Sequence, residues 1–449
     1  MPPYTIFVIL PVSWSSYAKL LKKTDIKKQQ EISLTEWGIL IIPEIVTIDS
    51  LGNNVGGIAR QEGYPAIFVK GALPGETVKI RPLKEKKNFI TAELVSVETP
   101  SKHRVKPFCK YYGKCGGCSL QHLDYNEQLK WKRAWIEKAL RNLEIPEIEQ
   151  TIPSPATTGY RNRVTFDVHN QQLTLHAFKG DPIPVAECPL MNETSKKALR
   201  FFQENNFLDE ALTKVSFRGA DNTEDGLIEL SGKFTKAISA NWPQVAQRAK
   251  IVWLQLNKGQ MIEKLGKYLF HVQPGGFFQV NTRAGEKLIE LVLKYNNEPG
   301  KKVLDLFGGV GSFGIPLAAE GFRVTSVELD WKTSKGCTEA ITINNIDPNN
   351  LRVITARDSS FLSKVIKKKI SFDTIITDPP RAGMGIRTAK QITRLKAKKI
   401  IYVSCNPFSA ARDLAVLVEG GYSIKQITPI DMFPHTDHIE AVFYLERGV

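Results

Sequence analysis

The sequence has no apolar run long enough to cross a membrane as a helix, and it has few cysteines for its length. Residues 5–10 are apolar, but no basic segment precedes them, so a signal peptide is not predicted. Six cysteines in 449 residues are also too few for a disulfide scaffold. We therefore expect no membrane association and a location in the reducing cytoplasm.

Acidic residues are in deficit as well. The chain has 46 Asp and Glu against 61 Lys and Arg, and its net charge is +15. Such a chain suits a large polyanion, and a nucleic acid is the first candidate. A generally basic surface would give the same totals, so the charge supports this hypothesis without establishing it.

Four segments of the chain differ in their patterns. Residues 1–40 are a poorly specified extension, and we assign them no role. Residues 41–101 alternate short β-rich runs with Gly, Asn and Pro turns, which predicts a small OB-like β-barrel. Residues 102–280 indicate a mixed α+β domain. Residues 281–449 alternate strands with helices, which predicts an α/β domain with a doubly wound, Rossmann-like sheet.

Two basic runs lie in or next to the predicted barrel, at residues 84–87 and 102–106. Basic loops on a small barrel suit contacts with phosphates. For either run alone, a solvated loop is the better interpretation. Together with the net charge, the two runs favour binding to RNA.

Three cysteines lie close together with glycines between them, at Cys109, Cys115 and Cys118, and a fourth is Cys188. Thiolates close in sequence on a backbone that can wrap around an ion form sites for soft metals. The spacing therefore predicts a metal centre. It does not choose between tetrahedral zinc and an iron–sulfur cluster.

Cys405 follows a short apolar strand at residues 400–403, and Pro407 ends that strand because proline cannot continue a ladder. The thiol is thus expected at the carboxyl edge of the sheet, where open α/β sheets bind ligands. A lone cysteine in such a place is equally often a small buried apolar residue. The last two strands, at 422–430 and 439–445, are predicted as edge strands.

A glycine-rich turn at residues 309–314 matches G-x-G-x-x-G, and Glu328 ends the following strand, where a carboxylate can bind ribose hydroxyls. This motif would also fit NAD. Asp305 on the first strand and Asp378 in an Asp-Pro-Pro sequence are typical of nucleic-acid methyltransferases, so S-adenosylmethionine is the favoured cofactor. Cys337 falls in a predicted helix, and we interpret it as a packing residue.

With these motifs the sequence resembles the RNA (uracil-5-)-methyltransferases over residues 41–449. It is most similar to the branch that acts on 23S ribosomal RNA and carries a TRAM barrel and an iron–sulfur cluster. The motifs are Cys109-x5-Cys115-x2-Cys118 with Cys188, Phe278-Gln279-Val280-Asn281, Val303-Leu304-Asp305-Leu306-Phe307, Val403-Ser404-Cys405-Asn406-Pro407, and residues 431–440, which end in Glu440.

The resemblance implies S-adenosylmethionine-dependent methylation of carbon 5 of a uridine in 23S ribosomal RNA. It implies a [4Fe–4S] cluster on the four cysteines, Cys405 as the nucleophile and Glu440 as the base. The implied cofactor contacts are Gln279, Phe307, Ser312, Glu328, Asp358 and Asp378. The chain departs from the family pattern at Ser312, where many relatives have Asn, and at Pro380, where many have Ala.

The chemistry of uracil suits these residue types. Carbon 6 is a Michael acceptor, so a thiolate that adds there makes carbon 5 nucleophilic toward a sulfonium methyl group. A base must then remove the proton of carbon 5, and a glutamate whose pKa is raised by burial can do so.

Other functions remain open at this point. They are methylation of transfer RNA, a non-catalytic metal-containing RNA-binding protein, and an NAD-dependent enzyme, with zinc as the alternative metal. No obligate protein partner is evident, and we expect a monomer.

Overall fold

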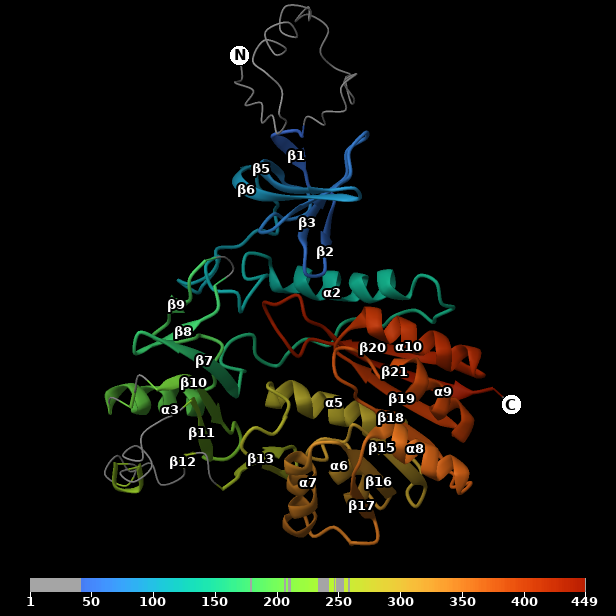
Figure 1. The fold of residues 1–449 in the computed structure, drawn as a ribbon. Coiled ribbons are helices and arrows are strands. Elements are labelled where there is room, and N and C mark those ends of the chain that lie inside the picture. Colours follow the sequence, from blue (N-terminus) through green and yellow to red (C-terminus); the bar gives the residue numbers. More distant parts are fainter. Residues whose placement is uncertain are drawn as a thin grey trace, which may run out of the picture. The chain divides into compact units, whose positions relative to one another are not determined.

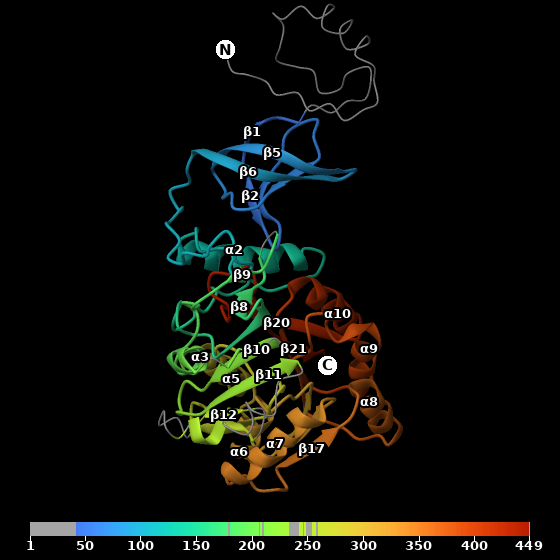
Figure 2. The same cartoon turned by 60° about the vertical axis from the view of Figure 1, so that its left-hand side comes forward.

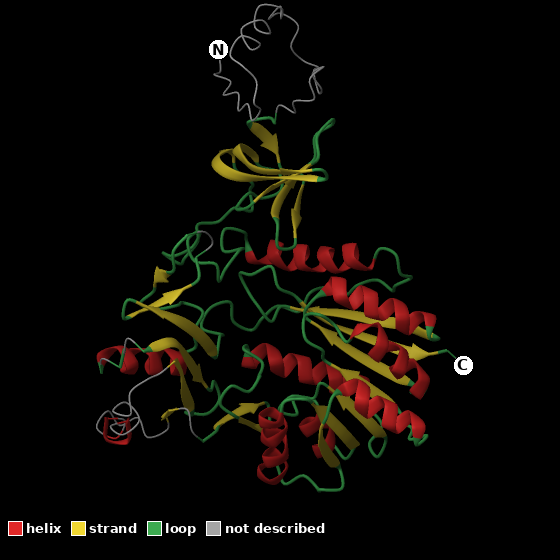
Figure 3. Cartoon of the chain, viewed as in Figure 1, coloured by secondary structure: helices red, strands yellow, loops and turns green. Residues whose placement is uncertain are grey.

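The computed structural model divides into two compact units, residues 1–104 and 105–449, and each is described by itself. Figure 1 labels the elements and Figure 3 distinguishes helices from strands. The predicted extension at residues 1–40 lies outside the described part. The described residues are 42–177, 180–205, 207–208, 211–232, 242–245, 247, 254–256 and 259–448.

The first unit is a single six-stranded sheet with the strand order β1-β5-β6-β4-β3-β2. All neighbouring strands pair antiparallel except β4 and β6, and the apolar side chains of one face form a separate core. The predicted small β-domain is thus present. The strands are β1 Ile45–Thr47, β2 Ser50–Gly52, β3 Gly56–Ala59, β4 Ala66–Val69, β5 Thr77–Lys86 and β6 Phe89–Thr99.

Arg104 has an internal role in this unit. Its guanidinium donates hydrogen bonds of 2.5 and 2.8 Å to the carboxylate of Glu76, which is fully buried. The basic run at 102–106 is therefore not available as a whole for phosphates. The lysines at the tip of the β5–β6 hairpin are exposed, as the sequence suggested.

The second unit contains two larger sheets and a hairpin. The smaller of the two sheets has the order β12-β11-β10-β7-β8-β9. Its elements and their neighbours are α2 Tyr125–Leu140, β7 Arg163–His169, β8 Gln172–Leu175, β9 Ile183–Pro184, α3 Glu193–Glu204, β10 Leu212–Gly219, β11 Gly226–Gly232, β12 Leu254–Leu256, and the hairpin β13 Met261–Leu265 with β14 Tyr268–Val272.

The seven-stranded sheet has the order β17-β16-β15-β18-β19-β21-β20. The strands from β17 to β19 are parallel, and β21 runs antiparallel between β19 and β20. The elements are α5 Thr282–Tyr295, β15 Lys302–Leu306, α6 Gly314–Ala319, β16 Arg323–Glu328, α7 Trp331–Ile343, β17 Leu351–Thr355, α8 Asp358–Lys367, β18 Thr374–Thr377, α9 Gly385–Leu395, β19 Lys399–Ser404, α10 Pro407–Glu419, β20 Tyr422–Ile430 and β21 Glu440–Arg447.

One detail of the predicted order was wrong. The strand that begins at Glu440 is not an edge strand, because β21 is hydrogen-bonded to β19 on one side and to β20 on the other. Of the last two strands, β20 lies at an edge of the sheet and β21 in its interior. The last strand of the chain thereby lies directly next to the strand that precedes Cys405.

Both faces of this sheet are buried, which explains its continuous apolar strands. Alternate residues of β19 enter different cores: Ile401 packs with α5, α6 and α7, whereas Ile400 packs with α8, α9 and α10. Figures 1 and 2 show the two groups of helices on opposite faces. The fold is the predicted doubly wound α/β sheet. None of the described helices is both long and apolar enough to cross a membrane.

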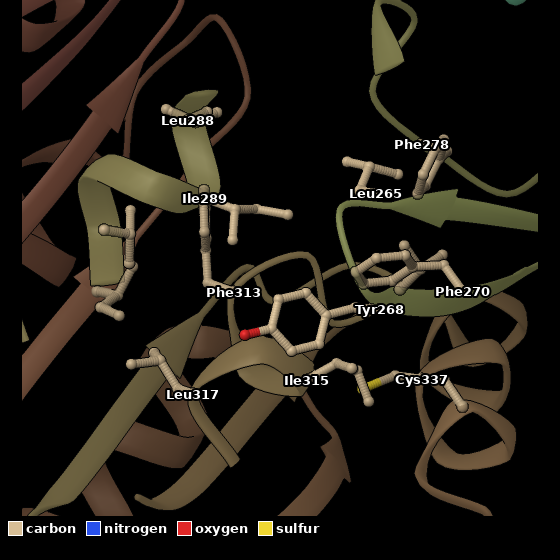
Figure 4. Close-up of a cluster of buried hydrophobic side chains, with 14 of the residues drawn as sticks. Leu265, Tyr268, Phe270, Phe278, Leu288, Ile289, Phe313, Ile315, Leu317 and Cys337 are labelled. Atoms are coloured by element: carbon tan, nitrogen blue, oxygen red, sulfur yellow. The ribbon is translucent and has the colours of Figure 1, made fainter. Parts of the chain in front are cut away.

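The core on the side of α5 to α7 supports the glycine-rich turn (Figure 4). The sulfur of Cys337 lies there beside Ile315 and is fully buried, so its predicted packing role is confirmed. Gly311 has φ +88°, and a Cβ atom there would lie 2.7 Å from that sulfur. The turn can approach α7 this closely only with glycine at this position.

Candidate active site

Cys405 directly follows β19, and Glu440 is the first residue of the neighbouring strand β21. Ser404 of β19 pairs with Ala441 of β21 in antiparallel register, so the next pair of positions is Cys405 and Glu440. The charge of Glu440 acts on the thiol of Cys405, so the two side chains lie near each other. The order of the strands thus brings together the two residues predicted for catalysis.

The carboxyl group of Glu440 is buried, and one of its two oxygens lacks a hydrogen bond. The residue is 4% exposed, and its Oε1 atom has no hydrogen-bond partner among the described residues. Burial raises the pKa of this carboxyl well above its ordinary value, the charge of Asp378 raises it further, and the charge of Arg381 opposes both. A carboxylate in this environment is a stronger base than one in water.

The thiol of Cys405 is half-buried and feels the same charges. Burial raises its pKa to about 12, the carboxylates of Glu440 and Asp378 add to the rise, and Arg381 opposes it. The raised pKa means that the protonated thiol predominates at neutral pH. This thiol is therefore expected to react slowly with electrophiles in the RNA-free protein.

We expect alkylation of Cys405 by iodoacetamide to be slow in the RNA-free protein and to accelerate steadily up to at least pH 10, because only the thiolate reacts. Asp378→Asn should increase the rate at neutral pH several-fold, because it removes a negative charge that disfavours the thiolate. Mass spectrometry of the peptide that contains Cys405 measures both. A rate that levels off below pH 8 would contradict this interpretation.

Asp378 joins this pair to the glycine-rich turn. It follows β18, and Gln279 Nε2 donates a hydrogen bond of 3.5 Å to its Oδ2 atom. Burial raises the pKa of Asp378, and the neighbouring Asp305 raises it further. Asp305 is fully buried on β15, and burial raises its own pKa to about 7. Acidic groups therefore extend from the turn toward the reactive thiol.

The glycine-rich turn holds Glu328 in a fixed position. The backbone N–H of Gly309 donates a hydrogen bond of 3.0 Å to Glu328 Oε2, and the N–H of Asp330 donates one of 2.8 Å to Oε1. Phe307 has φ +60°, a conformation that is rare outside glycine and is often found at functional sites. Ser312 lies half-buried in the same turn.

Asp358 is the first residue of α8, just beyond the carboxyl end of β17. Its Oδ2 atom accepts a hydrogen bond of 2.6 Å from Thr388 of α9. One of its oxygens thus already has a protein partner. Its contact with a cofactor stays a prediction.

The four predicted metal-binding cysteines, Cys109, Cys115, Cys118 and Cys188, all line one cavity of about 530 Å³. Burial raises the pKa of Cys118 to about 12 and also raises that of Cys188, and the charges of the other thiols contribute. In the described part of the chain, no three His, Cys, Asp or Glu side chains are grouped closely enough to hold a metal ion. The cavity has the thiol donors that a soft metal or a cluster requires.

The sequence analysis missed one residue of the site, Arg381, whereas His438 was interpreted as local structure near Glu440. The positive charge of Arg381 lowers the pKa of the Cys405 thiol and also that of the Glu440 carboxyl. Its Nη2 atom donates a hydrogen bond of 3.0 Å to His438 Nε2, and burial lowers the pKa of His438 to about 4, so this ring is a neutral acceptor. The signal for Arg381 was its place directly after Asp-Pro-Pro.

The fold is that of an S-adenosylmethionine-dependent methyltransferase. Residues 124–448 match the family described as tRNA (uracil-5-)-methyltransferase, and residues 45–95 match the TRAM domain. The chain belongs to this family and is an RNA (uracil-5-)-methyltransferase with an N-terminal TRAM domain.

Individual relatives cover nearly the whole chain. A 23S rRNA (uracil(1939)-C(5))-methyltransferase of Aeromonas hydrophila is 32% identical over 89% of this chain and 96% of its own length. An enzyme of the same description from Marinomonas sp. is 31% identical over 89% and 94%. The structure of a tRNA (uracil-54, C5)-methyltransferase of Pyrococcus abyssi, in complex with S-adenosyl-L-homocysteine, is 28% identical, covers 90% of this chain and 99% of that chain, and has a TM-score of 0.71.

Proposed function

We propose that this protein methylates carbon 5 of a uridine in 23S ribosomal RNA, with Cys405 as the nucleophile and Glu440 as the base. The observation that supports this proposal is the pairing of β19 with β21, because Cys405 directly follows β19 and the buried Glu440 begins β21, near enough for its charge to act on the thiol. A surface glutamate on an edge strand would not have this environment.

The first step is the addition of the Cys405 sulfur to carbon 6 of the uracil. The thiol gives its proton to solvent water, the S–C6 bond forms, and the electrons of the C5–C6 double bond move into an enolate. Because the pKa of the thiol is raised in the RNA-free protein, the thiolate needs stabilisation during the attack. The charge of Arg381 supplies it, since it favours the thiolate.

S-Adenosylmethionine supplies an electrophilic methyl group when it is bound. Glu328, which the N–H of Gly309 fixes, suits the ribose hydroxyls. Gln279, Phe307 and Asp378 lie around the same turn, and with Ser312 and Asp358 they complete the set that we propose for the cofactor.

Glu440 completes the reaction. Its carboxylate takes the proton of carbon 5, the electrons of that C–H bond form the C5–C6 double bond, and the S–C6 bond breaks to leave the Cys405 thiolate. A buried carboxylate with a raised pKa accepts this proton more readily than a solvated one.

The names of the relatives support 23S ribosomal RNA, whereas the solved structure is that of a transfer-RNA enzyme. The deciding experiment incubates the purified protein and tritiated S-adenosylmethionine with fragments of 23S rRNA and with unmodified tRNA. We expect label in the rRNA fragment at one uridine, located by nuclease mapping. Labelling of tRNA alone would reverse the assignment.

We also propose that the four cysteines of the cavity hold a [4Fe–4S] cluster, with zinc as the alternative. Support comes from the four thiols that line the same cavity, whereas the other two cysteines, Cys337 and Cys405, lie outside it. We propose residues 41–101 as an RNA-binding module, within the domain division given in the sequence analysis. We also propose that the protein is a monomer located in the cytoplasm.

Anaerobically prepared protein should be brown and contain about four iron and four sulfide per chain. Cys188→Ser should lower the iron content by more than half, because a cluster with three protein ligands is lost more readily. Cys337→Ser, a cysteine outside the cavity, is the matched control and should keep the iron. Stoichiometric zinc in the wild-type protein would refute the cluster.

A further inference from the structure

A basic groove of about 500 Å³ begins at the amino ends of β15 and β16 and runs along β17, against α8, as far as Ala356. Its floor is apolar, with the buried rings of Phe361 and Phe372. No Asp or Glu is among the described residues that line it. Five exposed cations line it: Lys302, Arg323, Arg352, Lys364 and Lys368.

These cations have no ion-pair partners in the described part of the chain, in contrast to their neighbours. Lys301 and Lys399, which lie outside the groove, each pair with Glu298, at 3.6 and 3.5 Å. Asp373, next to Lys302, uses its carboxylate to accept a backbone N–H at 3.0 Å. Crowded, unneutralised cations of this kind attract a polyanion.

We propose that this groove binds the phosphate backbone of the RNA substrate, outside the segment that enters the active site. Lys302 and Arg323 begin their strands, at the edge of the parallel sheet opposite to the end of β19 that Cys405 follows, and three strands separate β17 from β19. Arginines bind phosphate with two parallel hydrogen bonds and lysines as point charges. Thr325, Asn349 and Ser371 add neutral donors to the lining. The substrate of the family favours RNA over an acidic polypeptide.

The test compares Lys364→Gln/Lys368→Gln with a matched control, Lys390→Gln/Lys425→Gln, which removes two exposed lysines elsewhere. Affinity for a long 23S rRNA fragment is measured at several salt concentrations. For the groove variant we expect about tenfold weaker binding and a slope of log K against log[salt] smaller by about 1.5 than in the wild-type protein, since each lost phosphate contact lowers it by 0.7–0.9. The control variant should show less than half of this decrease in slope relative to the wild-type protein.

Methylation of a short oligonucleotide that contains only the target region should be unchanged in the groove variant. Equal salt slopes for the groove and control variants would overturn the proposal. So would loss of methylation of the short oligonucleotide, which would place the groove within the active site. Weaker binding of poly-glutamate with unchanged binding of RNA would assign the groove to an acidic polypeptide instead.

A second, independent observation links the cysteine loop to the loop that leads to Glu440. The backbone N–H groups of Ser119 and Leu120 donate hydrogen bonds of 3.0 and 2.9 Å to the carbonyl of His435. Ser119 Oγ accepts one of 3.0 Å from the N–H of Asp437. Ser119 directly follows Cys118, so the segment that carries a proposed metal ligand holds the peptide three residues before the base.

His435 is held in an unusual conformation. Its φ of +65° is left-handed, and such a conformation in a non-glycine residue persists only when its surroundings enforce it. Gln128 of α2 accepts the N–H of His435 at 3.0 Å, and Phe108 packs edge-on against its ring. The bonds from Ser119 and Leu120 are therefore part of what fixes the course of this loop.

We infer that Ser119 is a positioning residue for Glu440, and that the cysteine loop thereby controls the proton-abstraction step. This inference rests on the proposed function. When the loop is loosened, sulfur addition and methyl transfer still occur, because both precede the removal of the C5 proton by Glu440. Only that removal is slowed. The C5 proton then stays on the methylated adduct, the S–C6 bond does not break, and the enzyme remains attached to RNA.

The test uses protein with its full complement of iron. Ser119→Ala should turn over about tenfold more slowly and accumulate an enzyme–RNA adduct that survives SDS, and Ser119→Thr, which retains the hydroxyl, should restore turnover. Glu440→Gln calibrates the assay. If Glu440→Gln gives no adduct, the proposed function fails. If it does and Ser119→Ala gives neither adduct nor slower turnover, the positioning role is overturned.

Discussion

Glu440→Gln is expected to trap the enzyme on its RNA after a single methyl transfer. The amide has nearly the size of the carboxylate but cannot accept the proton of carbon 5, so the S–C6 bond cannot break. Turnover should fall by about 10²- to 10⁴-fold, the usual contribution of a general base. The measurement is one equivalent of tritiated methyl per enzyme in a complex that resists SDS.

The control for this variant is Glu446→Gln, at the other end of the same strand, where the carboxylate accepts a hydrogen bond from Tyr444. It should turn over normally and leave no adduct. Normal turnover by Glu440→Gln would refute the assignment of the base. A complete loss of methyl transfer without adduct would instead place Glu440 in the first half of the reaction.

Cys405→Ala should abolish methylation, by at least about 10⁴-fold, which corresponds to more than about 5 kcal/mol of activation free energy. Without the sulfur, carbon 5 of uracil does not become nucleophilic. Binding of S-adenosylmethionine should persist, because the residues proposed for it lie on other strands. Calorimetry and a filter assay for methyl incorporation measure the two properties.

Cys405→Ser is a second variant with a weaker nucleophile of similar size, and it should also be inactive. The combination of Cys405→Ala with Glu440→Gln should form no adduct, because the sulfur makes the bond. Substantial turnover by Cys405→Ala would exclude covalent catalysis by this thiol.

The sequence predicted the parallel part of the large sheet with boundaries within a residue or two, since apolar strands and the glycine-rich turn carry strong local signals. The strand expected at 400–403 is Lys399–Ser404, and Cys337, expected in a helix, lies in Trp331–Ile343. The positions of Asp378 and Cys405 at the carboxyl ends of two strands could be predicted as well, because they follow directly from where the apolar runs end.

The place of β21 could not be predicted this way. Nothing in residues 439–445 distinguishes an edge strand from an interior one, because that difference depends on which neighbours supply the hydrogen bonds. The same holds for Arg381, whose effect on Cys405 comes from a contact in space. The bonds from Ser119 and Leu120 to His435 join segments more than 300 residues apart, and local patterns carry no trace of them.

The interior position of β21 has a consequence for biosynthesis. The proposed base is the first residue of this strand, which ends at Arg447 and fills the space between two strands made earlier. A ribosome that stalls or a protease that cuts before this point therefore leaves a polypeptide with all the cysteines but an open gap in its sheet. Such a fragment would expose two hydrogen-bonding edges and should aggregate rather than act as a weak enzyme.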